Sequence, residues 1–299
     1  MRICILAEGC YPYVVGGVSS WVQMLMTGLP EHEFVIYSVG AEAKDRGKFK
    51  YKLPENCIGV EESFLDEILS LRGSEMMENI LTGEEQQTLY EFVSGKRDVP
   101  LKRLAEIFHY GRWKSPLAVF MSSDFFDIIV RIYREGYNNL PFTDFFWTMR
   151  SMLLPLFFLL QQKLPEADVY HSVATGYCGV IGAMAATLYN KPYMITEHGI
   201  YSREREAEII KSDWAKTDFK GVWIRYFYYL ARISYHAANR LYTLFEHNGQ
   251  IAADLGCAPE KIHIVPNGVH MDRFTHIPST MAGRSRSVRS CASCPSRTF

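Results

Sequence analysis

The chain has 299 residues, of which 48% are hydrophobic and 22% charged, a balance typical of a globular protein large enough to bury a full core. Its formal net charge of -1 creates no long-range field that would attract nucleic acid or anionic lipid, so we expect no nucleic-acid partner. The seven cysteines, an odd number at irregular spacing, do not form the pattern of a secreted disulfide scaffold.

The first residues run directly into a β-branched stretch, without the basic region and cleavage site of a signal peptide. Together with the cysteine usage, this predicts a cytoplasmic protein. The most apolar stretch, residues 145–160, carries Arg150 and Pro155 and is shorter than the roughly 20 apolar residues of a membrane span. We expect a buried or groove-lining helix there, the alternative being membrane contact.

Seven short runs rich in β-branched residues are predicted strands. They lie at residues 2–7, 34–40, 57–64, 168–173, 193–199, 240–245 and 261–268. Helical segments such as 19–29 alternate with them, which predicts a Rossmann-like α/β fold with a parallel sheet and helices on both faces. A long, mostly helical stretch at about residues 61–166 interrupts the alternation, and we expect an inserted helical subdomain there.

A glycine pair, Gly16 and Gly17, lies between the first predicted strand and the first helix. Such a pair permits positive φ and lets a ligand approach without a Cβ in the way, while the following helix offers free amides and the positive end of its dipole. Either Ser19 or Ser20 can cap that helix. The spacing matches neither a dinucleotide fingerprint nor a P-loop, so contact with a phosphate or sugar hydroxyl and a plain turn are the open alternatives.

A second polar motif, Thr196-Glu197-His198-Gly199, ends the fifth predicted strand. Ligands of open parallel sheets bind beyond the carboxyl ends of the strands, so His198 is a candidate catalytic residue, the alternative being a histidine bonded to the backbone. The charged stretch 201–206 then opens a helix. That stretch is either a solvated face or a place where arginines meet anionic groups.

The C-terminal residues 276–299 are expected to be disordered, because arginine, serine and small residues predominate there without apolar periodicity. The single C-x-x-C pair, Cys291 and Cys294, lies in this tail. The nine histidines show no metal-ligand spacing, so no metal site is expected.

Three stretches together resemble GT-B glycosyltransferases of family 4, and among them the PelF type associated with Pel exopolysaccharide synthesis in bacteria. The resemblance runs from residue 1 to about residue 275. The stretches that carry it are Glu8-Gly9 with Tyr11-Pro12 and Gly16-Gly17-Val18-Ser19-Ser20-Trp21, then Thr196-Glu197-His198-Gly199-Ile200-Tyr201, and finally Val265-Pro266-Asn267-Gly268-Val269.

The resemblance implies a reaction. A sugar, glucose in the PelF type, would pass from a UDP-sugar to a polysaccharide acceptor with retention of configuration, without a cofactor or a required metal. Stabilisation of the leaving diphosphate would be the main catalytic contribution.

The motifs also supply candidate site residues. The resemblance implies that Gly16 and Gly17 approach the donor diphosphate and that His198 lies near the transferred sugar. Glu197 is a further candidate for donor binding. Candidates for anion or acceptor contacts are Tyr201, Arg203 and Arg205.

In GT-B enzymes the Pro-Asn-Gly-Val turn leads into a second domain with most of the sugar-nucleotide site, whereas about thirty residues follow it here. We therefore expect residues 1–275 to be the acceptor-side domain, inactive as a transferase by itself. Possible codons for Ser293–Phe299, read in a frame shifted by one base, can encode Val-Pro-Ile-Lys-Asp-Val. This peptide resembles the start of the second domain of the family. A frameshift between about residues 278 and 290 is our hypothesis for the tail.

The alternative is a function without catalysis. The chain would then be a non-catalytic binding module, or a partner subunit of an inner-membrane exopolysaccharide synthesis complex.

Overall fold

The computed structural model describes residues 1–268 except 72–79, 97, 114 and 116. The expectations for the tail at 276–299, including Cys291 and Cys294, lie outside the described residues. Met1–Pro266 form one compact unit.

The described residues contain one seven-stranded parallel sheet with the order β3-β2-β1-β4-β5-β6-β7. Its strands are β1 (Arg2–Glu8), β2 (Glu33–Gly40), β3 (Cys57–Phe64), β4 (Val169–Ser172), β5 (Tyr193–Glu197), β6 (Arg240–Thr243) and β7 (Ile262–Ile264). Each corresponds to one of the seven predicted runs, so the predicted parallel α/β sheet is confirmed.

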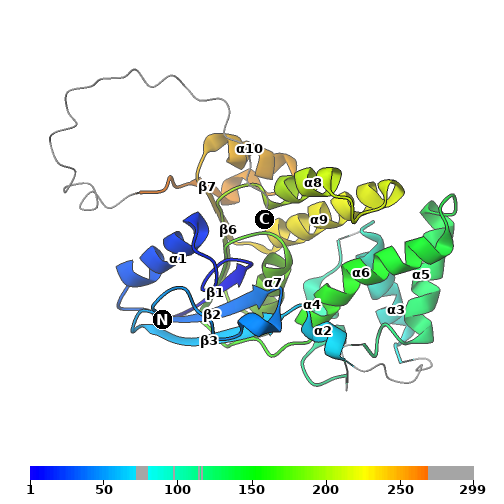
Figure 1. Ribbon diagram of the computed structural model, residues 1–299, viewed down its shortest axis with the longest axis horizontal. Coiled ribbons are helices and arrows are strands. Elements are labelled where there is room, and N and C mark those ends of the chain that lie inside the picture. Colours follow the sequence, from blue (N-terminus) through cyan, green and yellow to red (C-terminus); the bar gives the residue numbers. More distant parts are fainter. Residues whose placement is uncertain (72–79, 97, 114, 116, 269–299) are drawn as a thin grey trace. The chain divides into compact units, whose positions relative to one another are not determined.

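Strand β1, in the interior of the sheet, is buried on both faces, as expected for a strand between two helical layers. On one face Ile3, Ile5 and Ala7 pack with Val22 and Met26 of helix α1 (Gly17–Gly28). The intervening Cys4 and Leu6 belong to the larger core on the other face. Helices therefore cover both faces of the sheet, as predicted (Figure 1).

The larger core contains residues of most of the other helices. Helix α7 connects β4 to β5 and contacts β1, β4 and β5. The helices of this half are α7 (Tyr177–Tyr189), α8 (Tyr201–Lys211), α9 (Thr217–Ala237) and α10 (Glu246–Asp254).

Between β3 and β4 the described chain is mostly helical. Its helices are α2 (Glu67–Ser70), α3 (Gly83–Ser94), α4 (Leu101–Phe108), α5 (Ser123–Gly136) and α6 (Phe142–Leu160). The predicted start at about residue 61 falls inside β3, because Ser63 and Phe64 still pair with Val39 and Gly40 of β2.

The apolar stretch at residues 145–160 lies within α6, where most of its side chains are buried in the larger core. The predicted buried helix is therefore confirmed. Within the described part of the chain, no helix is both long enough and apolar enough to cross a bilayer.

Candidate functional site

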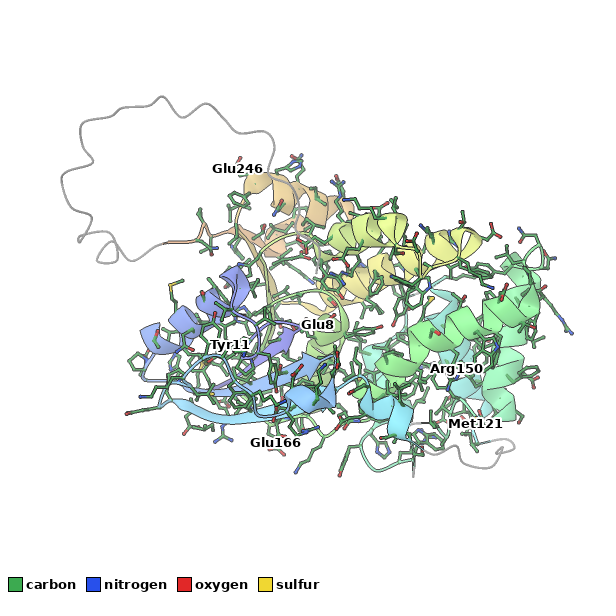
Figure 2. The ribbon with its side chains drawn as sticks, in the orientation of Figure 1. Glu8, Tyr11, Met121, Arg150, Glu166 and Glu246 are labelled. Atoms are coloured by element: carbon green, nitrogen blue, oxygen red, sulfur yellow. The ribbon has the colours of Figure 1, made fainter. Side chains whose placement is uncertain are left out.

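The strand order reverses direction between β1 and β4. From β1 the chain continues to β2 and β3 on one side, and from β4 to β5, β6 and β7 on the other. Loops at such a point diverge and leave a crevice beyond the carboxyl ends of the strands, where open α/β sheets bind ligands. Glu8 at the end of β1 and Tyr11 in the following loop mark this edge (Figure 2).

The glycine pair begins helix α1, and its conformation differs from the predicted one. Gly16 is the N-cap in an extended conformation, with φ -172°, and Gly17 is the first helical residue. Neither has positive φ, whereas Gly9 in the same loop has φ 62°. The predicted serine cap is wrong, because the helix starts two residues earlier and the Gly16 carbonyl accepts from the Ser20 amide at 2.9 Å.

The space in front of the glycine pair is open. Gly16 and Gly17 are exposed, and a Cβ built at either position meets no atom within 4 Å. No acidic side chain occupies the first turn of α1. An anion can therefore reach the first amides of α1, where the helix dipole favours negative charge. The predicted contact with a donor diphosphate fits this geometry and stays a prediction.

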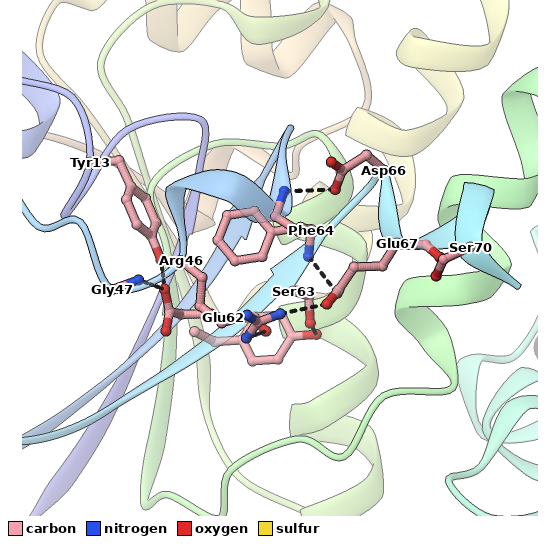
Figure 3. A network of polar contacts seen from close by, with 11 residues as sticks. Tyr13, Arg46, Gly47, Glu62, Ser63, Phe64, Asp66, Glu67 and Ser70 are labelled. Carbon is pink, nitrogen blue, oxygen red and sulfur yellow. Dashed lines mark hydrogen bonds and ion pairs between the residues drawn. The ribbon is translucent and has the colours of Figure 1, made fainter.

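The loop before the glycines is anchored to the end of β3. The Tyr13 hydroxyl donates to the Glu62 carboxylate, which also accepts from the Gly47 amide at 2.8 Å (Figure 3). Arg46 lies 4.9 Å from the centre of the Phe64 ring and donates to Glu67 at 2.5 Å. Through Glu62, the loop before the glycines is thus joined both to β3 and to the segment that connects β2 to β3.

His198 lies just after β5, with its ring against Trp21 of α1 at a centroid distance of 4.9 Å. Its Nε2 atom is buried and has no hydrogen-bond partner among the described residues. Burial lowers the pKa of the imidazole below its usual value, so the ring is neutral at pH 7. A neutral imidazole with an unused nitrogen can donate to or accept from a ligand hydroxyl.

A second histidine, His171 on β4, contacts the same tryptophan at a ring distance of 5.7 Å. Its Nε2 lies 2.7 Å from the Thr196 hydroxyl. Burial, with a smaller contribution from His198, lowers the pKa of His171 to about 4. Sequence reasoning missed both His171 and Trp21. The available signals were a histidine inside a predicted strand and an indole one helical turn after Gly17.

Glu197 is 2% exposed and directed into the protein. Its carboxylate accepts from the Thr175 hydroxyl at 2.9 Å, the Tyr201 amide at 3.1 Å and the Tyr235 hydroxyl at 2.5 Å. Burial raises the pKa of Glu197 to about 7, although these bonds act in the opposite direction. Glu197 thus joins β5 to α8 and α9. This arrangement favours a role in positioning the neighbouring His198 over the predicted contact with the donor.

Tyr201, a predicted anion or acceptor contact, lies beside β1. Its hydroxyl donates to Glu8 at 2.6 Å, and the Cys178 amide donates to the other Glu8 oxygen at 3.1 Å. Gly176 is needed here, since a Cβ at that position would lie 2.4 Å from the Tyr201 ring. Tyr201 therefore links the start of α8 to the carboxyl end of β1.

The two arginines that follow differ in their surroundings. Arg203 is exposed, whereas Arg205 is partly buried with its guanidinium 5.4 Å from the centre of the Tyr201 ring. Arg205 also donates to Glu208 at 2.6 Å. The structure brings Arg205 to Tyr201, and an anion contact by either arginine stays a prediction.

Among the residues that the structure describes, no group of three or more His, Cys, Asp or Glu side chains is arranged to hold a metal ion. The polar groups at the carboxyl edge of the sheet are neutral imidazoles, helix amides and buried carboxylates.

Residues 1–260 match the family described as "Domain of unknown function (DUF3492)". Over 135 residues the chain is 25% identical to a GDP-mannose:cellobiosyl-diphosphopolyprenol alpha-mannosyltransferase of Xanthomonas oryzae pv. oryzae (strain PXO99A), a match that covers 45% of this chain and 32% of that enzyme.

Among solved structures, Anabaena HepE in complex with UDP and glucose is similar, with a TM-score of 0.41 and 12% identity, over 93% of this chain and 48% of HepE. The chain spans less than half the length of either protein.

Proposed function

The chain belongs to the DUF3492 family, and we propose that within it this protein forms the acceptor-side half of a retaining PelF-type glycosyltransferase with the GT-B fold. In this proposal the enzyme transfers glucose from UDP-glucose to an exopolysaccharide acceptor in the cytoplasm and needs no metal. The motif resemblance and the similarity to a mannosyltransferase over 135 residues support the class of reaction.

One observation carries the proposal. Just after β5, His198 has a buried Nε2 without a partner among the described residues, and its ring lies against Trp21 of α1, the helix that begins with the open glycine pair. A buried, unpaired polar atom is costly to a fold, so its presence at a ligand-binding edge favours a role in binding.

Each group then has a role. The His198 imidazole, fixed by Trp21, contacts a hydroxyl of the transferred sugar, while the amides of α1 face the diphosphate through the open space at Gly16 and Gly17. Sugar transfer with retention of configuration requires groups that stabilise the charge of the leaving diphosphate from both sides. We therefore propose that residues 1–268 bind the donor but need a second domain for turnover.

Titration calorimetry of the full chain with UDP and UDP-glucose tests the proposal. His198→Ala should weaken UDP-glucose binding about tenfold, the equivalent of about 1.4 kcal/mol, and UDP binding less, because the imidazole faces the sugar. His109→Ala, an exposed histidine of the helical insertion, is the matched control. Equal affinities of both variants for UDP-glucose would reject the role of His198.

The absence of binding to either ligand would reject the proposed donor contacts of this half. Capture of inner-membrane exopolysaccharide complex proteins by the same preparation would then favour the alternative, a non-catalytic partner subunit.

A further inference from the structure

A cavity of about 560 Å³ lies between the helical insertion and α9, with a different set of residues from the carboxyl edge of the sheet. The ends of α3 and α5, the middle of α6, helix α9 and the turn after α10 line it. Its volume is in the range of small-molecule sites in proteins. The cavity does not involve His198, Gly16 or Gly17.

The inner part of the cavity is apolar and aromatic. Met149 and Met152 of α6, Ile132 of α5 and Val222 of α9 are buried in its wall. Methionine side chains adapt to irregular ligands and make favourable contacts with rings. This wall suits an apolar or aromatic body.

Three neighbouring tyrosines of α9 line the cavity, and their hydroxyls differ in hydrogen bonding. The hydroxyl of Tyr226 donates to the Met152 carbonyl at 2.9 Å, and that of Tyr228 to Glu206 at 2.6 Å. The neighbouring Tyr229 hydroxyl is buried and has no hydrogen-bond partner among the described residues. A native fold rarely leaves such a group unpaired unless a water or a ligand satisfies it.

The two arginines of the lining differ in how their charge is balanced. Arg232 forms an ion pair with Asp98 at 3.2 Å. Arg225 is exposed, and within the described chain its recorded polar contact is the Tyr137 hydroxyl at 3.5 Å. The carboxylate of the lining, Asp254, is also exposed. Among the described residues, Arg225 is thus a cation of the lining without a paired carboxylate.

We propose that this cavity binds an amphipathic organic anion, with its apolar body among the methionines and tyrosines and its anionic group between Arg225 and the Tyr229 hydroxyl. The proposal is independent of the transferase function. A lipid-like alkyl phosphate and a nucleoside monophosphate share this chemistry, and the experiment separates them.

Fluorescence titration of the full chain with 1-anilinonaphthalene-8-sulfonate, an aromatic body carrying one sulfonate, tests the site. Saturable binding is expected at one site. Arg225→Gln should raise the Kd about fivefold, and Tyr229→Phe, which removes only the hydroxyl, about threefold. Ser94→Trp, which fills the cavity from the end of α3, should abolish binding. Arg103→Gln, on the exposed face of α4, is the control for a lost positive charge.

Equal dye binding by wild type, Arg225→Gln and Tyr229→Phe would overturn the proposal, even if Ser94→Trp does not fold. Competition identifies the source of the natural ligand. Displacement of the dye by decyl phosphate assigns a lipid-like ligand, and displacement by uridine monophosphate assigns a nucleotide. If neither competes, a lipid-like alkyl phosphate and a nucleoside monophosphate are both wrong as the source.

Discussion

The open space in front of the glycine pair can be tested by adding a single methyl group. Gly17 is the first residue of α1, lacks positive φ, and has no neighbour within 4 Å of a built Cβ. Alanine lowers the entropy lost on helix formation, so Gly17→Ala should stabilise the free protein by about 0.5–1 kcal/mol and raise Tm by about 1–3 °C.

The same methyl group should weaken ligand binding. A diphosphate oxygen must come within about 2.9 Å of the α1 amides to form a charge-assisted hydrogen bond. Loss of one such bond costs about 1.5–3 kcal/mol, which corresponds to an increase in the Kd for UDP of roughly 10- to 100-fold.

Gly28→Ala is the matched control, since Gly28 lies at the other end of α1, also without positive φ and with open space around it. Thermal unfolding and calorimetry with UDP provide the two measurements. A stabilised Gly17→Ala protein that binds UDP as well as Gly28→Ala does would refute the approach of a diphosphate to this loop. A lower Tm would refute the described geometry.

Three further predictions concern buried groups near the carboxyl edge of the sheet. Burial raises the pKa of Glu197 to about 7 from 4.5, so the folded state holds a proton that the unfolded chain has released between these values. The free energy of unfolding should therefore fall as pH rises from 4.5 to about 7, by at most about 3 kcal/mol. In urea unfolding curves, Glu197→Gln should remove this fall, and parallel pH profiles for the two proteins would contradict the prediction. Gly176→Ala should destabilise the protein by about 1–3 kcal/mol, because the added Cβ would lie 2.4 Å from the Tyr201 ring. In the double variant with Tyr201→Ala, part of that loss should be recovered, whereas additive changes in the free energy of unfolding would rule out the clash. The pKa of His171 is about 4, so its NMR signals should remain those of a neutral ring down to about pH 5, and a titration midpoint above pH 6 would be inconsistent with its burial.

The fold could be predicted from the sequence because its strands are short β-branched runs between helical segments, a local property of the chain. Element boundaries were less accurate, as at Phe64, since pairing with β2 rather than composition determines where β3 ends. The glycine pair predicted an open approach, while its positive φ was wrong. Glycine permits that conformation without requiring it.

The site was harder to predict because its contacts join distant parts of the chain. Trp21 meets His171 only because β1 and β4 are neighbours in the sheet. Glu197 has the same local pattern as a ligand-binding carboxylate at a strand end. Its burial depends on Tyr235, which α9 brings from a later part of the sequence.

The order of the strands has a consequence for the covalent chain. Strands β1, β2 and β3 precede the helical insertion and β4 to β7 follow it, so the insertion is the one covalent link between the two parts of the sheet. A protease cut between Phe64 and Val169 would leave two fragments that meet along the β1 and β4 pairing. The candidate site lies on that junction, with Glu8 and Trp21 from the first fragment and His198 and Tyr201 from the second. A ligand bound there would contact both fragments and hold a nicked protein together.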